Sequence, residues 1–172
     1  ETEQMSTPEG IIAKDADLVS AVLAKDLKDL EKISNELLRE AETQFLTIAQ
    51  RNGNVLFKPN FPILSGENVL VEKIAGEASE GRSAVNIDTS ETEGFSVRAA
   101  SPIIDKGKII GILITGFLLD NFFAEKFKNI SSFETSLFPE NKVVGSTLFK
   151  AGDTLEEKEI VEIPITWEEG ET

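Results

Sequence analysis

The 172-residue sequence predicts an α+β fold, in which a five- to six-stranded antiparallel sheet carries a long N-terminal helix on one face. Two patterns indicate this class. Apolar residues recur at three- or four-residue steps in the first third of the chain, and short apolar runs separated by turn residues follow. Hydrophobic residues make up 40% and charged residues 28%, which is ordinary for a globular domain.

The N-terminal third is expected to form one long amphipathic helix, because Lys, Asp and Glu fill the faces between its apolar positions. Asp15 or Asp17 would cap its start, and no Gly or Pro interrupts it before residue 43. A single apolar stripe needs a single partner surface. That surface is either a sheet of the same chain or the same helix of a second copy. The stripe consists of Val19, Leu23, Leu27, Leu30, Ile33 and Leu37.

The rest of the chain alternates between strand signals and turns. Asn52-Gly53 is a strong hairpin signal between the apolar runs 45–49 and 55–57. Further elements are expected as a short helix at 68–78, two strands on either side of a turn at 105–108, a short helix after Asp120, and a hairpin of 134–138 with 142–146. Residues 79–94 are polar and rich in turn formers, and segment 59–94 is the only large piece available to cover the second face of the sheet.

Composition excludes several classes of function. The formal charge of −14, from 17 basic and 31 acidic residues, argues against nucleic-acid binding. Without Cys or His there are no disulfides, no usual zinc sites and no Ser-His-Asp or Cys-His arrangements. No phosphate-binding loop or catalytic constellation is found, so we expect neither an enzyme nor a cofactor or metal site. The apolar run 109–119 is far shorter than the roughly 20 residues of a spanning helix.

Arg98 is the most informative residue, since it lies in a predicted hairpin of otherwise apolar character. If the turn pairs Ile104 with Ile109, facing positions have numbers that sum to 213. One face then carries Ser96, Arg98, Ala100, Leu113, Thr115 and Phe117. The other, with Val97, Ala99, Ile112, Ile114 and Gly116, would seat the long helix. A bulge at Pro102 would shift the register by one and turn Arg98 outward.

A buried guanidinium needs a partner, because leaving the charge unpaired costs several kcal/mol. Two interpretations stay open. Arg98 forms a structural ion pair with an acidic residue such as Asp88 or Glu91, or it binds a group that arrives from outside.

The string VRAASPIIDKGKIIGILITGFLLDNFF resembles the Cache domain, a PAS-like extracytoplasmic sensor module of bacterial chemoreceptors and sensor histidine kinases. AVLAKDLKDLEKI is similar to its membrane-distal helix, FLTIAQRNGNVLFKP to its first hairpin, and ETSLFPENKVVGSTL to its closing hairpin. The predicted organisation is a leader at 1–16, a Cache-like domain at 17–150, and an acidic tail at 151–172 that is a linker or the start of a second module.

The resemblance implies a function for the arginine. The citrate and C4-dicarboxylate sensor kinases of that family hold a ligand carboxylate with an arginine four residues before a proline, and Arg98 has this relation to Pro102. Lys58 matches the histidine of a basic pair in those kinases, whereas Val55 stands where they have arginine, which argues against citrate itself. The expected ligand-binding residues are Arg98, Ser96, Thr115, Phe117 and Lys58.

The resemblance therefore predicts the ligand-sensing domain of a transmembrane receptor, outside the cytoplasm and attached to the inner membrane through segments beyond this sequence. The partner would be a small organic acid or amino acid, and the domain would form a homodimer through its N-terminal helix. The alternative is a PAS- or profilin-like structural or interaction domain without a small ligand. A cytoplasmic PAS module is a third possibility.

Overall fold

The computed structural model describes residues 16–41, 43–59, 66–90, 94–139 and 142–149, without the side chains of Asp88 and Ser90. The chain divides into two compact units, Glu1–Leu118 and Leu119–Thr172.

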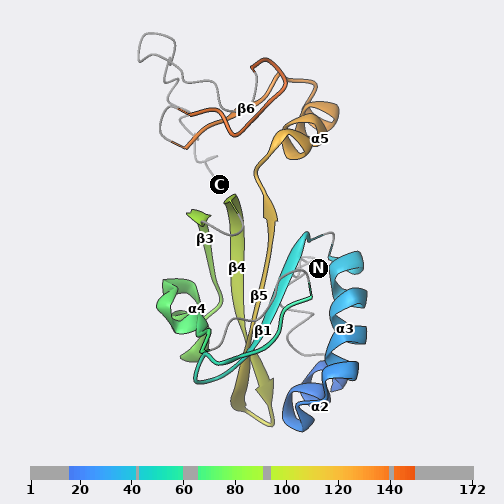
Figure 1. Cartoon of the computed structure of the whole chain (residues 1–172), viewed down its shortest axis with the longest axis vertical. Coiled ribbons are helices and arrows are strands. Elements are labelled where there is room, and N and C mark those ends of the chain that lie inside the picture. The colour runs from blue at the N-terminus through green and yellow to red at the C-terminus, as the bar shows by residue number, and fades with distance from the viewer. Residues whose placement is uncertain (1–15, 42, 60–65, 91–93, 140–141, 150–172) are drawn as a thin grey trace, which may run out of the picture. The chain divides into compact units, whose positions relative to one another are not determined.

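The first unit contains a five-stranded antiparallel sheet in the order β2-β1-β5-β4-β3 (Figure 1). Its strands are β1 Phe45–Gln50, β2 Val55–Phe57, β3 Ala84–Ser90, β4 Gly94–Asp105 and β5 Lys108–Leu118. Gly53 has φ +86°, the left-handed conformation that the predicted Asn-Gly turn requires. The α+β class and both hairpins predicted for this unit are confirmed.

The N-terminal helix is two helices rather than one, α2 Ala16–Ala24 and α3 Leu27–Glu40. The break lies at Lys25, which has φ +53°, and at Asp26, which caps α3. The Asp26 carboxylate accepts hydrogen bonds from the backbone N–H of Lys28 at 2.9 Å and of Asp29 at 3.3 Å. The apolar spacing continues across the break between α2 and α3. For this reason the periodicity predicted a single helix.

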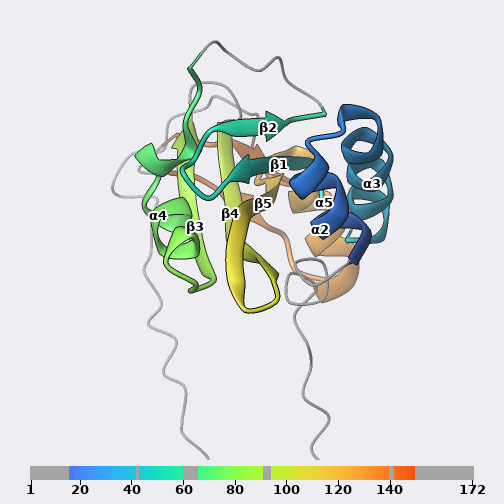
Figure 2. The same cartoon turned by 90° about the horizontal axis from the view of Figure 1, so that it is seen from below.

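Most of the apolar stripe of α2 and α3 packs on one face of the sheet, here called the helix face (Figure 2), whereas Leu23 and Leu27 are exposed. Leu30 and Ile33 from α3 belong to the same buried cluster as Ile48 of β1 and Leu113 of β5. Of the two partners considered for the stripe, the structure uses the sheet of the same chain, and the outer side of α3 is mostly charged.

The opposite face, here called the covered face, is closed by the 3-10 helix η1 Val69–Val71 and by α4 Lys73–Ser79. Ile74, Ala75 and Ala78 of α4 lie in one buried cluster with Ile112 and Ile114 of β5. The prediction that segment 59–94 supplies this cover is confirmed for its described helical part. The helix expected at 68–78 is seen as these two short elements.

Segment 79–94 was described as polar and rich in turn formers, and no strand was predicted there, but its central part is a strand. Residues 84–90 form β3, which pairs along its whole length with β4 from Ala84↔Ala100 to Ser90↔Gly94. The alternation of Val85 and Ile87 with polar residues is the strand signal that the polar composition concealed.

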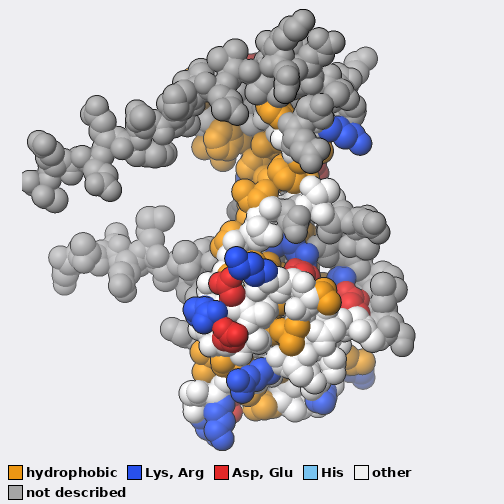
Figure 3. All heavy atoms as spheres, turned by 90° about the vertical axis from the view of Figure 1, so that its left-hand side faces the viewer, with side chains coloured by type: hydrophobic (Ala, Val, Ile, Leu, Met, Phe, Trp, Pro, Cys, Tyr) orange, Lys and Arg blue, Asp and Glu red, His pale blue; other side chains and the backbone are white. Residues whose placement is uncertain are grey.

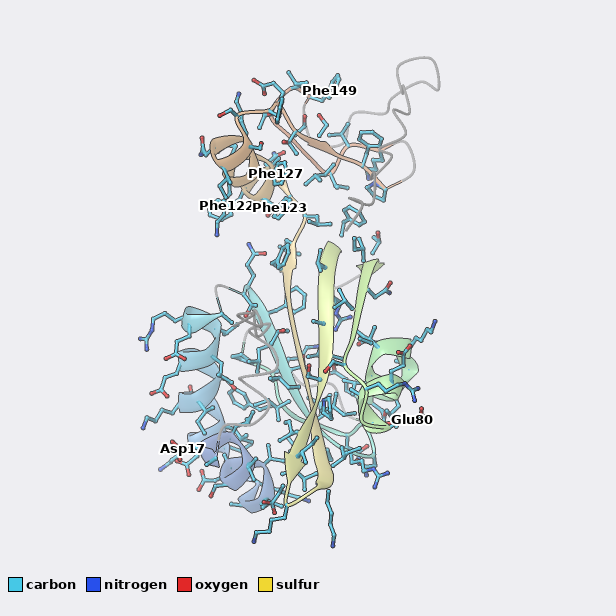
Figure 4. The ribbon with its side chains drawn as sticks, turned by 180° about the vertical axis from the view of Figure 1, so that it is seen from behind. Asp17, Glu80, Phe122, Phe123, Phe127 and Phe149 are labelled. Carbon is cyan, nitrogen blue, oxygen red and sulfur yellow. The ribbon has the colours of Figure 1, made fainter. Side chains whose placement is uncertain are left out.

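The second unit contains α5 Asn121–Ser131 and a two-stranded sheet of β6 Ser136–Leu137 and β7 Gly145–Ser146. Asp120 caps α5 by accepting from the Phe123 N–H at 3.0 Å, and the rings of Phe123 and Phe127 stack with centroids 6.2 Å apart (Figure 4). The expected helix and hairpin are confirmed. The predicted acidic tail at 151–172 lies outside the described residues.

Glu134 gives this unit a pH dependence of known sign. A hydrogen bond from Lys128 and a second one from the Thr147 hydroxyl hold the pKa of the Glu134 carboxyl below its usual range. Because the pKa of Glu134 is lower in the folded than in the unfolded state, its carboxylate stabilises the folded state at pH values above the unfolded-state pKa. This stabilisation is lost as the pH falls through the folded-state pKa. We expect Glu134→Gln to reduce the loss of thermal stability on acidification slightly, because the carboxylate is exposed. A pH series of melting curves measures this, and an unchanged acid limb would contradict it.

Candidate functional site

The register of the β4–β5 hairpin decides which side chains share a face with Arg98. The turn pairs Ile104 with Ile109, as predicted, but an irregularity follows, and Ile103 pairs with Gly111. From there on the residue numbers of two paired residues add up to 214 instead of 213. Arg98 therefore lies opposite Gly116 and not opposite Thr115. A one-residue bulge at Ile110 on β5 produces the shift. The possibility of a shift was foreseen, but with its origin at Pro102.

Arg98 lies on the covered face, in the same row as Gly116 of β5 and Phe45 of β1. Its Nη1 is 3.0 Å from Oε2 of Glu72, the residue between η1 and α4. The two side chains are 12% and 27% exposed, so the pair is largely removed from water. The guanidinium carbon also lies 5.7 Å from the centroid of the Phe45 ring. An internal acid therefore holds Arg98, and it comes from the cover; Glu91 and the side chain of Asp88 lie outside the described parts.

Gly116 provides the space for this arrangement. A Cβ at residue 116 would lie 2.3 Å from the Phe45 ring and 2.5 Å from the carbonyl oxygen of Val97. The Phe45 ring therefore lies over Gly116. A side chain at residue 116 would occupy this space and keep the ring away from the Arg98 guanidinium. Phe45 and Glu72 were not among the predicted site residues, because their role depends on the true register and on the course of the cover.

Ser96 lies two residues from Arg98 on the same face and is fully buried. Its hydroxyl has no hydrogen-bond partner within the part of the chain that the structure describes. A buried hydroxyl without a partner costs about 1–3 kcal/mol, so it is a group that an incoming polar atom would satisfy. The structure brings together two of the predicted residues, Arg98 and Ser96.

Thr115 and Phe117 do not belong to this group. The register shift places them on the helix face, where Thr115 lies between Leu46 and Ala99 and Phe117 lies opposite Val97. Leu113, expected beside them, is a core residue under α2 and α3. Conversely, the covered face contains three residues that were expected under the N-terminal helix, namely Ile112, Ile114 and Gly116.

Lys58 follows β2 and forms an ion pair with Glu67, with Nζ and Oε1 2.7 Å apart. The two side chains are 12% and 20% exposed, so this ion pair is largely removed from water. Both ion pairs, Lys58–Glu67 and Arg98–Glu72, link the sheet or its edge to the segment 66–79.

The groups of the site are suited to binding a polar ligand. They are a guanidinium, a carboxylate, an aromatic ring and a hydroxyl. Among the described residues no cluster of acidic side chains is arranged to hold a metal ion. Likewise no helix within the described ranges is both long and apolar enough to cross a membrane.

A five-stranded antiparallel sheet in the order β2-β1-β5-β4-β3, covered by helices on both faces, is a PAS-like α+β architecture. A family model described as a double sensory domain of two-component sensor kinases matches residues 2–162, and the chain belongs to this family. Over 110 residues it is 34% identical to the sensor histidine kinase DpiB of Escherichia coli. That match includes 63% of this chain and 19% of DpiB, so the chain spans about a fifth of the relative.

Solved structures have the same fold. The sensor domain of Escherichia coli DcuS has a TM-score of 0.58 at 14% identity, over 72% of this chain and 90% of that one. The sensor domain of the Vibrio cholerae histidine kinase DctB has a TM-score of 0.59 at 18% identity, over 90% of this chain and 64% of that one. The ligand-binding domain of the Campylobacter jejuni chemoreceptor Tlp3, in complex with L-valine, has a TM-score of 0.53 at 18% identity, over 81% and 59%. The chain is thus a sensory domain of the kind found in sensor kinases and chemoreceptors.

Proposed function

We propose that this chain senses a small carboxylate-bearing molecule outside the cytoplasm, as part of a transmembrane receptor whose catalytic output lies elsewhere in the protein. The observation that carries the proposal is a largely buried guanidinium, Arg98, on the same face as the fully buried Ser96 hydroxyl, which has no hydrogen-bond partner among the described residues. A guanidinium is suited to a carboxylate, and here it is already bound to one in a largely buried position. A ligand carboxylate would replace the Glu72 carboxylate without leaving Arg98 unpaired.

Exchange of partners at Arg98 also provides a means of signalling. Glu72 belongs to the segment between η1 and α4, so a ligand that takes its place frees or moves the cover. The coupling free energy between a ligand site and a responding segment is typically about 1–3 kcal/mol. Segment 66–79 would therefore respond to occupancy, and Lys58–Glu67 would keep its other end attached to the sheet.

Glu72 further narrows the ligand class. A purely anionic ligand at Arg98 would bring its carboxylate close to that of Glu72, and like charges at short range repel. A ligand with both a carboxylate and an ammonium group would pair with both residues, because its carboxylate takes the place of Glu72 at Arg98 and the displaced Glu72 carboxylate moves to the ammonium. Apolar Ile114 and Phe45 on the same face favour an apolar side chain on this ligand. One structural neighbour, Tlp3, is seen with L-valine and with isoleucine. We therefore favour an amino acid over a simple organic acid.

A thermal-shift series tests the site and the ligand class together. L-Valine, its deaminated analogue 3-methylbutanoate and its decarboxylated analogue 2-methylpropylamine differ only in the charged groups. A ligand at about 100 times its Kd adds about 2.7 kcal/mol to stability, which raises the Tm by several degrees. We expect stabilisation by L-valine alone in the native chain, and no stabilisation in Arg98→Ala. Arg82→Ala, which removes an exposed ion-paired arginine, is the matched control and should keep the response.

The thermal-shift results test the sensing function and the preference for amino acids separately. Stabilisation by 3-methylbutanoate but not by L-valine would keep the sensor and overturn the preference for amino acids. A flat response to a broad panel of amino and organic acids would instead favour a PAS-like interaction domain, for which the internal Arg98–Glu72 pair is the supporting observation.

The remaining features of the receptor belong to the same proposal. Residues 17–150 would be the sensory module, and 151–172 a linker or the start of a second one. Attachment to the inner membrane would come through segments outside this sequence. Finding membrane-spanning segments on both sides of this stretch in the full-length gene tests the location.

A further inference from the structure

We propose that residues 160–167 bind the second unit of the same chain and cover the apolar side of α5. Three large apolar side chains of this helix, Phe122, Phe127 and Ile130, are 67%, 46% and 76% exposed. Helical spacing places them, together with Phe123, within one sector of about 140°, here called the α5 face. The rings of Phe123 and Phe127 stack on this face (Figure 4). An exposed surface with so many large apolar side chains indicates an interaction site.

The chain leaves the described part of the second unit close to the start of α5. β7 lies beside this end of the helix, because the Ser146 N–H donates to Oδ1 of Asn121 at 2.8 Å. Leu148 and Phe149 follow β7 directly, and both are exposed. Figure 3 shows hydrophobic side chains at the surface of this unit. The residues after Phe149 are therefore the first stretch of the following chain that can cover the α5 face.

The sequence of residues 160–167 has the pattern of an extended segment with one apolar side. Apolar residues occupy every second position, and the positions between them hold Glu, Pro and Thr. The apolar positions are Val161, Ile163, Ile165 and Trp167. Extended chain from Val161 to Trp167 spans about 20 Å, whereas Phe122 and Ile130 are separated by about 12 Å along the helix axis. The segment is thus long enough to cover the whole α5 face.

Proximity and charge favour this segment over a second copy or a membrane. The connection 150–159 extends to at most about 33 Å, which reaches every part of α5, and a tethered segment acts at a millimolar effective concentration. The sector of the α5 face also contains Lys126, whereas Glu162 lies within the segment and Glu168 follows it. A second copy would bring lysine toward lysine, and the net charge of −14 disfavours an anionic membrane.

The extent of the family agrees with this assignment, because its model matches through residue 162, beyond the last described residue. Of the two roles left open for residues 151–172, the proposal excludes a free linker, since these residues complete the second unit. It does not depend on a ligand at Arg98.

Trp167 reports on the contact directly, because the chain has one tryptophan and no tyrosine. We expect its fluorescence in the native chain to be blue-shifted relative to the unfolded chain and to be quenched less by acrylamide. Ile130→Lys on the α5 face and Ile163→Lys in the segment each place a charge in the apolar contact, so each should abolish the blue shift. The matched controls should keep it. They are Leu27→Lys, which changes an exposed apolar residue of α3, and Thr166→Lys, which changes the polar side of the segment.

Engineered cysteines distinguish a contact within one chain from a contact between two chains, since the natural sequence has none. Phe127→Cys combined with Ile163→Cys should form a disulfide within the monomer under mild oxidation, at a rate independent of protein concentration. Leu27→Cys combined with Ile163→Cys is the control and should cross-link much more slowly.

Four results would overturn the proposal. The first is a native Trp167 emission equal to that of the unfolded chain. The second is a blue shift that is lost in Leu27→Lys but kept in Ile130→Lys. Cross-linked dimers in place of cross-linked monomers would make a second copy the occupant of the α5 face. A blue shift that appears only with phosphatidylglycerol vesicles would make a lipid surface the occupant.

Discussion

Gly116→Ala should destabilise the first unit by about 3 kcal/mol, because the added Cβ meets both a ring and a backbone atom. The Phe45 ring at 2.3 Å can move, but the Val97 carbonyl oxygen at 2.5 Å belongs to the neighbouring strand and can yield only if the sheet distorts. Movement of the ring would also withdraw Phe45 from the Arg98 guanidinium. Chemical denaturation measures the loss as a lower midpoint at an unchanged slope.

The chain offers a matched control and a rescue for this result. A methyl group added to Gly76 of α4 would meet nothing within 4 Å, so Gly76→Ala should be neutral or stabilise by up to about 1 kcal/mol. In a Phe45→Ala background Gly116→Ala should cost less, because one of its two obstacles is gone. Equal effects of Gly116→Ala in both backgrounds would show that the ring does not lie over the glycine.

The elements of the fold could largely be predicted from the sequence, because their signals are local. Asn52-Gly53 fixes the first hairpin, the turn at 105–108 fixes the second, and Asp120 starts α5. The break in the N-terminal helix was missed although Asp26, its cap, is visible in the sequence. An acidic residue in a charged helix surface has the same appearance whether it caps a helix or faces solvent.

The site was harder to predict because it depends on register. The run from Ile109 to Leu119 has no charged residue and only one polar residue, Thr115, so it has no alternation that would show where a bulge lies. The extra residue, Ile110, resembles its neighbours. One position of shift left Arg98 and Ser96 together but moved Thr115 and Phe117 to the other face.

Glu72, the partner of Arg98, could not be identified for a different reason. It is 26 positions away and comes from the cover, whose path over the sheet is set by the packing of Ile74 and Ala78 on β5. Among 31 acidic residues the sequence contains no signal that singles it out. Pairs between distant segments depend on tertiary packing, which a local pattern does not reveal.

The Arg98–Glu72 pair should be strongly coupled, and a double-mutant cycle measures this. Arg98→Met leaves a largely buried carboxylate without its cation and should cost about 2 kcal/mol, less than for a fully buried pair because Glu72 is 27% exposed. Glu72→Gln should cost about 1 kcal/mol, since the amide still accepts a hydrogen bond from the guanidinium. The double variant should be less destabilised than the sum, with a coupling energy of about 1–2 kcal/mol.

The pair Arg82–Glu80 provides the control, because it has the same chemistry in an exposed setting. Its Nη2 and Oε2 are 2.7 Å apart, closer than in the Arg98–Glu72 pair, yet the side chains are 62% and 64% exposed; Glu80 is labelled in Figure 4. Exposed pairs contribute about 0–1 kcal/mol, and screening by salt weakens them further. The coupling energy at residues 82 and 80 should therefore be at most about 0.5 kcal/mol and disappear in high salt, whereas that at 98 and 72 should persist. Equal coupling in the two pairs would mean that Arg98 is solvated in solution, and the sheet would then have no sequestered cation to offer a ligand.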